Sequence, residues 1–80
     1  MDINQQKILA RITSSPGALG GKPAIRGLRF LVSDVLELLS TGMSEADILA
    51  QHPILEKEDI QAALLYASNK IKNTLIIHAA

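Results

Sequence analysis

The sequence has no cysteine and no tryptophan, and it has one tyrosine and one phenylalanine among its 80 residues. Without cysteine, the chain can form no disulfide and has no thiolate for catalysis or metal binding, which suits a reducing compartment. No apolar run reaches the roughly 18 residues that a membrane-spanning helix requires. The first residues also lack the basic-then-apolar order of a signal peptide. These absences favour a protein of the cytoplasm with no membrane partner.

Hydrophobic residues, in contrast, are abundant: they make up 48% of the chain, and the mean hydropathy is +0.21. A chain of this length forms one domain, residues 1–80, and so small a domain buries only a modest fraction of its surface. Part of the apolar surface should therefore be covered by another chain. On this ground we expect a homodimer.

Charge is balanced over the whole chain but divided unevenly along it. Residues 1–30 hold five basic side chains against one acidic, a net charge of +4, whereas residues 31–66 hold seven acidic against one basic, a net charge of −6. Lys70 and Lys72 bring the sum back to zero. Such a division indicates either two surfaces with different partners or two halves that meet each other within a dimer.

Residues 12–32 contain the turn signals and the strand-like segments. Glycine and proline are frequent in the first half of this region, which marks turns. Two short segments follow, Pro23–Ile25 and Leu28–Val32, and they are separated by Arg26 and Gly27. A two-residue connection with glycine in second place is typical of a tight hairpin turn, because glycine tolerates a positive φ. We therefore predict a β-hairpin over about residues 12–32.

The rest of the chain has helical spacing. It predicts three helices, at about residues 33–41, 45–51 and 57–72. Ser33 and Ser44 are suitable N-caps for the first two helices. Gly42 suits a left-handed C-cap, and Pro53 ends the second helix. The third helix carries an apolar stripe of Ile60, Ala63, Leu64, Ala67, Ile71 and Leu75. The predicted fold class is thus mainly α, a short N-terminal β-hairpin followed by a three-helix bundle of the helix-turn-helix type.

No group of residues in the sequence supports catalysis. Residues 20–23, Gly-Gly-Lys-Pro, resemble part of a phosphate-binding loop, but that motif requires glycine where Pro16 stands and serine or threonine where Pro23 stands. The two histidines, His52 and His78, have no cysteine or carboxylate at metal-ligand spacing. The carboxylates that cluster at helix starts complement the helix dipole. We therefore expect no enzyme activity, no metal and no cofactor.

Three basic residues of the predicted hairpin are candidates for binding a partner: Lys22, Arg26 and Arg29. If the hairpin forms, Arg26 is at its tip and the other two are on its stems. Such a ribbon could contact the phosphates of DNA or the acidic groups of a protein. The structural alternative is that an arginine pairs with helix-start carboxylates of its own fold. The sequence supports all three interpretations.

The C-terminal residues Leu75, Ile76 and Ile77 form a second candidate. Consecutive aliphatic residues near a chain end are unusual for a solvated terminus. They either continue the third helix into the core or a dimer interface, or they form a docking segment for a protein partner. In the second case they would bind as an added strand or as an amphipathic helix.

Three segments of the chain follow the order of a known family pattern: residues 20–30, GGKPAIRGLRF; residues 42–45, GMSE; and residues 53–67, PILEKEDIQAALLYA. In these motifs the chain resembles the bacterial family called domain of unknown function 433, over residues 12–67. The chain departs from the family pattern at Leu28 and Glu56, where the family usually has threonine, and at Phe30, where it has isoleucine.

The resemblance implies a homeodomain-like or winged helix-turn-helix fold and the function of a VapB-type antitoxin encoded beside a PIN-like nuclease toxin. We therefore expect the antitoxin of a type II toxin–antitoxin pair, which binds the toxin and can repress its own operon. The alternatives are a DNA-binding regulator without a toxin and a structural dimeric adaptor. A recognition helix that starts with Glu56, Glu58 and Asp59 would be repelled by phosphates, so DNA contact is expected from the hairpin instead.

Overall fold

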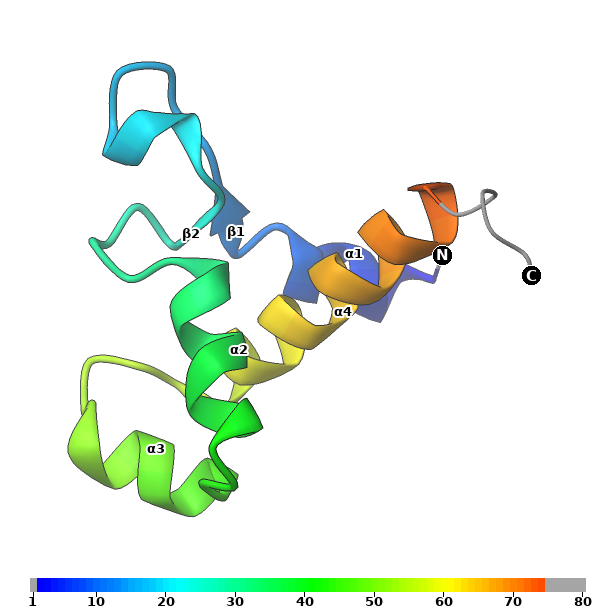
Figure 1. The fold of residues 1–80 in the computed structure, drawn as a ribbon. Helices are drawn as coiled ribbons and strands as arrows, with labels where there is room; N and C mark the ends of the chain where they lie inside the picture. Colours follow the sequence, from blue (N-terminus) through cyan, green and yellow to red (C-terminus); the bar gives the residue numbers. More distant parts are fainter. Residues whose placement is uncertain (1, 75–80) are drawn as a thin grey trace.

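The computed structural model describes residues 2–74, which form a mainly helical fold with a short two-stranded antiparallel hairpin (Figure 1). The elements are, in chain order, α1 (Ile3–Leu9), β1 (Ile12–Thr13), the 3-10 helix η1 (Leu19–Gly21), β2 (Ala24–Ile25), α2 (Val32–Ser40), α3 (Glu45–Gln51) and α4 (Lys57–Thr74). No helix of the described part is long and apolar enough to cross a membrane. The proposed docking residues Leu75, Ile76 and Ile77 lie outside the described residues.

Helix α1 corrects the sequence analysis, which predicts no element before residue 12. Its N-terminus is held by a capping box: the Gln5 N–H donates to the Asp2 carboxylate at 2.8 Å, and the Asp2 N–H donates to the Gln5 side chain at 3.3 Å. α1 packs along α4, and Figure 1 shows it beside the C-terminal part of that helix. The N-terminal segment is therefore part of the fold.

The strands of the antiparallel sheet differ from the predicted ones. β1 pairs with β2, and Ile12 lies opposite Ile25. The segment Leu28–Val32, predicted as the second strand, contributes one isolated bridge, between Ala24 and Leu31. Backbone hydrogen bonds also join the two predicted segments, from the Ile25 N–H to the Phe30 carbonyl at 2.8 Å and from the Val32 N–H to the Pro23 carbonyl at 3.0 Å. The predicted pairing is therefore present over a short stretch, while the strand partner of β2 comes from the other side in sequence.

The early start of α2 explains why the predicted second strand is so short. The Asp34 carboxylate accepts the Leu31 N–H at 2.9 Å, so that Leu31, and not Ser33, holds the N-cap position. Val32 therefore already belongs to the helix. The prediction of Ser33 as the N-cap was wrong because Asp34, the third residue of the helix, accepts a hydrogen bond from the backbone N–H of Leu31.

The tight turn at Arg26 and Gly27 is confirmed. Both residues have positive φ angles, 45° and 71°, and the Leu28 N–H donates to the Ile25 carbonyl at 2.7 Å. Such angles are those of the turn type that suits a right-twisted hairpin. Arginine is a costly choice at its first position, since a side chain in the left-handed region is crowded by the following carbonyl.

Helices α2, α3 and α4 follow one another through short connections. Thr41 is the C-cap of α2, and Gly42 follows it with a φ of 94°, the left-handed conformation that often ends a helix at this position. The Ser44 hydroxyl caps α3 by accepting the Asp47 N–H at 3.1 Å. The observed bounds of α3 are those expected, while α4 runs to Thr74.

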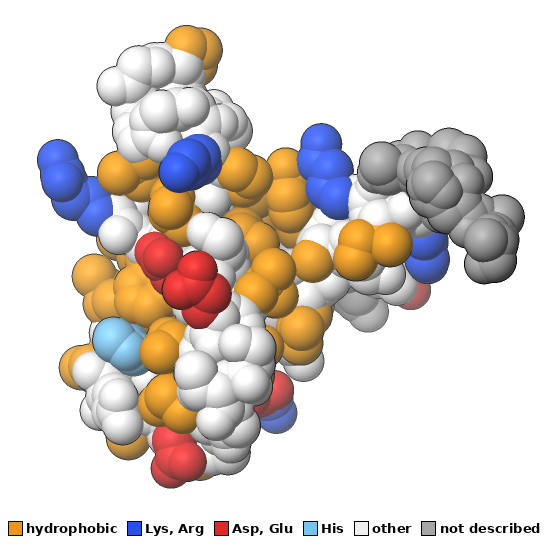
Figure 2. All heavy atoms as spheres, viewed as in Figure 1, with side chains coloured by type: hydrophobic (Ala, Val, Ile, Leu, Met, Phe, Trp, Pro, Cys, Tyr) orange, Lys and Arg blue, Asp and Glu red, His pale blue; other side chains and the backbone are white. Residues whose placement is uncertain are grey.

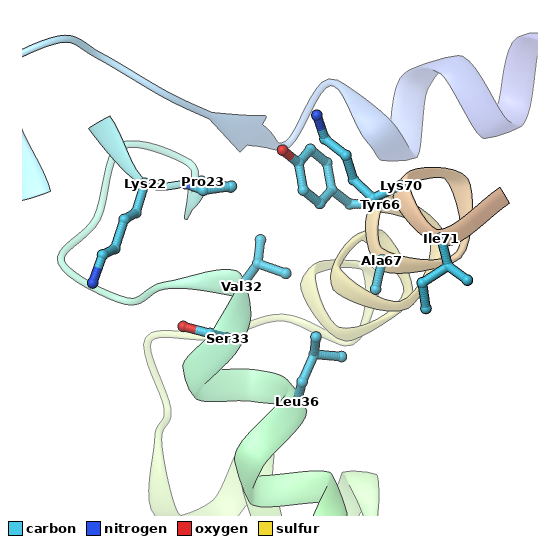
Figure 3. A pocket seen from close by; sticks show the side chains of 9 residues that line it. All are labelled: Lys22, Pro23, Val32, Ser33, Leu36, Tyr66, Ala67, Lys70 and Ile71. Atoms are coloured by element: carbon cyan, nitrogen blue, oxygen red, sulfur yellow. The ribbon is translucent and has the colours of Figure 1, made fainter. Parts of the chain in front are cut away.

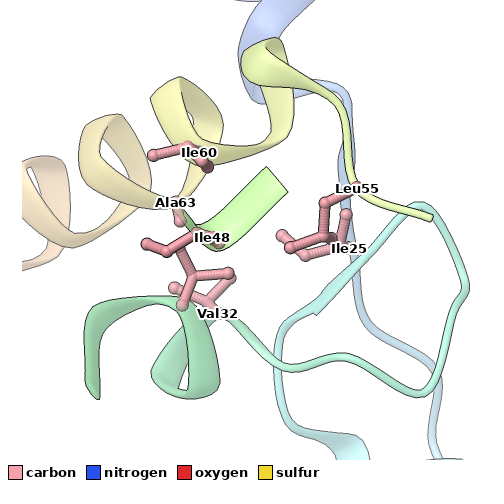
Figure 4. Packing of buried hydrophobic residues seen from close by; sticks show 7 residues of the cluster. Ile25, Val32, Ile48, Leu55, Ile60 and Ala63 are labelled. Carbon is pink, nitrogen blue, oxygen red and sulfur yellow. The ribbon is translucent and has the colours of Figure 1, made fainter. Parts of the chain in front are cut away.

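The core lies where α2, α3, β2 and the first turns of α4 meet (Figure 4). Its buried side chains are Ile25, Val32, Val35, Ile48, Leu55, Ile60 and Ala63. They come from every element after residue 24, which explains why a chain with such short strands can still close one apolar interior. The core occupies one end of α4 and leaves the other end outside it.

Candidate functional site

A cluster of four charged side chains lies at the start of α4, and we call it the charged cluster: Arg11, Arg26, Glu56 and Asp59. Arg11 stands between α1 and β1, and Arg26 is in the tight turn after β2. Glu56 precedes α4, and Asp59 is in its first turn. The cluster therefore joins three segments that are far apart in the sequence.

Asp59 is the centre of the charged cluster and has no exposed surface. The Arg26 guanidinium donates to both of its carboxylate oxygens, from Nε at 3.0 and 3.2 Å and from Nη2 at 2.9 Å. Arg11 Nη1 donates to Asp59 Oδ1 at 2.9 Å and to Glu56 Oε1 at 2.7 Å. The Glu56 N–H completes the set by donating to Asp59 Oδ2 at 2.8 Å.

These contacts fix the charge state of Asp59. Burial raises the pKa of its carboxyl group, but the hydrogen bonds from Arg26, from the Glu56 N–H and from Arg11 together lower that pKa below its ordinary value. Hydrogen bonds from Arg11 to Glu56 and then to Asp59 raise the pKa of Arg11. Asp59 is thus ionised at neutral pH with its oxygens occupied, which does not suit a general acid or base.

The three predicted binding cations are not equivalent in the structure. Arg26 turns inward to Asp59 and also donates to the Ile54 carbonyl at 2.8 Å, so the structural alternative describes its contacts. Lys22 and Arg29 are exposed and form no ion pair within residues 2–74. In Figure 2 the basic side chains are scattered over the visible face, with hydrophobic side chains between them.

An apolar groove between α2 and α4 is the second feature of interest (Figure 3). Val32 and Leu36 of α2 face Ala67 and Ile71 of α4 across it, and its volume is about 510 Å³. Within residues 2–74, the groove is lined by Lys22, Pro23, Val32, Ser33, Leu36, Tyr66, Ala67, Lys70 and Ile71. We call this the α2–α4 groove.

The groove continues the apolar stripe of α4 beyond the core. On this stripe Ile60 is fully buried, whereas Ile71 is 68% exposed. The change follows from geometry, since α4 has 18 residues and the elements around its first turns do not reach its last ones. The groove is therefore the part of a helix interface that the described chain leaves open.

The two histidines were predicted to bind no metal, and the structure describes one of them, His52. His52 ends α3, as predicted, and its ring meets the edge of Phe30 at 5.1 Å between ring centroids. His78 lies outside the described residues. In the part of the chain that the structure describes, no three His, Cys, Asp or Glu side chains are grouped so that they could hold a metal ion.

Comparison with known proteins agrees with the motifs. A family model described as "Protein of unknown function (DUF433)" matches residues 12–67, which is more than half of the chain. The chain belongs to the DUF433 family. An uncharacterized protein, y4eO of Sinorhizobium fredii, is 43% identical over 56 residues, which cover 70% of this chain and 25% of that protein. The chain thus spans about a quarter of the length of this curated relative.

A solved structure places the fold in the same family. The crystal structure of a DUF433 member protein from Anabaena variabilis superposes with a TM-score of 0.72 at 29% identity, over 89% of this chain and 71% of that one. Neither relative is described by an activity. The DUF433 assignment therefore fixes ancestry and fold, while function depends on the surfaces themselves.

The sequence did not predict the part that Arg11 plays, and it left the pairing of Arg26 with a helix-start carboxylate as one of three alternatives. Both acidic residues of the charged cluster were visible as helix-start carboxylates, but their partners lie 33 to 48 positions away. One signal was available: Asp59 is the third residue of α4, the position from which a carboxylate reaches back to the N-cap N–H. That signal predicts the local bond and not the two arginines.

Proposed function

We propose that this DUF433 chain is a protein-binding module that serves as the antitoxin of a type II toxin–antitoxin pair in the cytoplasm. It neutralises a PIN-like nuclease by binding it, and it has no enzyme activity of its own. The observation that supports this proposal is the distribution of polar and apolar groups. The buried carboxylate is committed to arginines, whereas aliphatic side chains are left on the surface.

The exposed aliphatic residues are numerous for so small a domain. Ile3, Ile54, Leu64 and Ile71 are 65%, 56%, 47% and 68% exposed. Of these four, Ile71 lies in a continuous apolar surface with Leu36 and Ala67 in the α2–α4 groove, and continuous apolar surface of this kind is typical of contact sites for other chains. A toxin at one such site and a second antitoxin copy at another would account for this surface. We therefore retain the homodimer as part of the proposal, with Leu64 outside the groove as its first candidate contact.

A second candidate function is DNA binding, by which the antitoxin would repress its own operon or act as a regulator without a toxin. The charged cluster changes the electrostatic argument against it. Two of the three acids at the start of α4, Glu56 and Asp59, are paired with arginines, so the helix start repels phosphate less than its sequence suggests. Lys22 and Arg29 favour this function because both remain exposed.

Co-expression with the operon neighbour tests the antitoxin proposal. The two proteins should elute as one complex from a sizing column, and the complex should lack the ribonuclease activity of the neighbour alone. Light scattering of the isolated chain, whose mass is 8.6 kDa, should give a dimer. A neighbour that elutes separately and keeps its activity contradicts the antitoxin function, and a monomer contradicts the dimer.

A gel-shift titration with the promoter of the same operon tests the DNA-binding function separately from the toxin-binding function. Replacing Lys22 and Arg29 by alanine should weaken binding to all sequences alike and reduce the salt dependence by about two units of slope. An operon fragment that the parent chain does not bind at low salt removes the DNA function and leaves the toxin-binding one intact.

A further inference from the structure

We infer that the α2–α4 groove binds an amphipathic helix of a protein partner, one whose aliphatic face is flanked by carboxylates. This inference rests on the proposed protein-binding function and adds the surface and the chemistry of the partner. The first argument is the stripe of α4. Its buried half packs against α2 and α3, and the same helix face continues into the groove through Ala67 to Ile71.

The shape of the groove favours a helix as its occupant. Two helices already form its walls, and Figure 3 shows Val32 and Leu36 facing Ala67 and Ile71 across an open space. A third helix can lay side chains at positions i, i+3, i+4 and i+7 into such a space. The face of α4 that lines the groove runs from Tyr66 to Ile71, about one and a half turns, so that the contact is short.

Charge decides between partners. Among the described residues, the two charged side chains that line the groove are both lysines, Lys22 and Lys70, and none of the lining side chains is a carboxylate. The Lys70 ammonium lies 5.5 Å from the centre of the Tyr66 ring, which holds it at the edge of the apolar floor. A partner helix that carries Glu or Asp beside its apolar face would meet both lysines with opposite charge.

The same charges disfavour a second copy of this chain in the groove. In a twofold contact the surface faces itself, and the lysines of the two copies would share an interface to which the groove contributes no carboxylate. A second copy is therefore the competing occupant, and the experiment below separates the two.

The test is an NMR titration of the full chain with two synthetic helical peptides of about 14 residues. Both carry leucine at i, i+3, i+4 and i+7; one has glutamates on either side of the leucines and the other has lysines. The glutamate peptide should shift the amide signals of Val32, Leu36, Ala67 and Ile71. It should bind roughly 3- to 30-fold more tightly than the lysine peptide, because the positive charge at the edge of the groove attracts glutamate and repels lysine.

Two sets of variants give the controls. Ile71→Glu should abolish peptide binding, whereas Ile54→Glu, which alters an isoleucine of similar exposure at the other end of α4, should not. Lys22→Glu combined with Lys70→Glu should reverse the preference in favour of the lysine peptide. Both isoleucines are exposed, so circular dichroism should show unchanged folding. Equal binding of the two peptides, or shifts confined to other residues, overturns the inference.

The failure of this inference is distinguishable from failure of the antitoxin proposal. A toxin complex that survives Ile71→Glu keeps the proposed function and overturns the groove as its site. A chain that binds the glutamate peptide in the groove but forms no complex with its operon neighbour keeps the groove and overturns the antitoxin function. If Ile71→Glu instead converts a dimer into a monomer, the groove is a contact between copies and the assigned partner is wrong.

Discussion

The two ends of α4 lie on one helix and share one apolar stripe, yet they differ in how much of that stripe is buried. At the first turn, Asp59 and Ile60 are fully buried, and arginines from two other segments pair with Asp59. Toward the last turns, Ile71 is mostly exposed and faces an open groove. The comparison teaches that burial along a helix is decided by which elements pack against each of its faces.

The largest expected loss of stability comes from a substitution at Asp59, in the first turn of α4. Asp59→Asn keeps the shape of the side chain but removes the charge that two guanidinium groups share. We expect the free energy of unfolding to fall by about 3–5 kcal/mol, the usual cost of breaking a buried ion pair by removing one partner. Urea titration followed by circular dichroism measures it. The control is Glu58→Gln, an exposed neighbour in the same turn, and equal losses for both variants would remove the structural role of Asp59.

The second prediction compares the same substitution at the two ends of the stripe. Ile60→Ala should lower the free energy of unfolding by about 2–5 kcal/mol, because it leaves a cavity in the core. Ile71→Ala should change it by no more than about 0.5 kcal/mol, since the side chain is already in contact with water. The same urea titration measures both. Similar losses at the two positions would show that the isolated chain already covers its groove.

A smaller loss of stability is expected for Arg26→Ala, since Arg11 continues to pair with Asp59. Arg26→Lys should not restore the parent stability, because an ammonium cannot donate to both carboxylate oxygens from a planar fork. The matched control is Arg29→Ala, which removes an exposed arginine of the same loop. The urea midpoint should be highest for Arg29→Ala, lower for Arg26→Lys and lowest for Arg26→Ala. An Arg29→Ala variant as unstable as Arg26→Ala contradicts the role of the charged cluster.

Acid should weaken the stabilisation that Asp59 gives to the start of α4. The folded pKa of Asp59 is lowered, so the unfolded chain binds more protons as the pH falls below its ordinary pKa of about 3.9. The stabilisation is therefore complete above that pH and is lost as the pH falls through the lower folded value, with a slope of at most about 1.4 kcal/mol per pH unit. Thermal melts across this range should show a steeper decline for the parent than for Asp59→Asn. Parallel declines would mean that other carboxylates carry the acid sensitivity.

Sequence patterns predicted the parts of the fold that local chemistry determines. Gly27, Gly42 and Ser44 each do what their residue type favours. Helix α1 was not predicted because it is seven residues long and has little apolar periodicity, although Asp2 and Gln5 have capping-box spacing. β1 escaped because a strand of two residues carries no alternation to detect.

The candidate site was less predictable than the fold, for a physical reason. The interpretation that an arginine pairs with helix-start carboxylates was among the alternatives, and Arg26 makes that contact. Nothing local in the sequence shows that Arg26, and not Arg29, makes this ion pair, because the pairing depends on where the turn places each side chain against α4. The α2–α4 groove depends in the same way on how far α2 extends along its neighbour.

The left-handed backbone of Arg26 has a consequence for how the molecule opens. A turn that relied on its own residues would place asparagine or glycine there, because arginine at a φ of 45° resists the conformation. The side chain of this same residue reaches Asp59, 33 positions later. The turn is therefore poorly stable by itself and is completed only when α4 has formed. Hairpin and helix should then unfold as one cooperative unit, and a local opening of the turn would release the first turn of α4 with it.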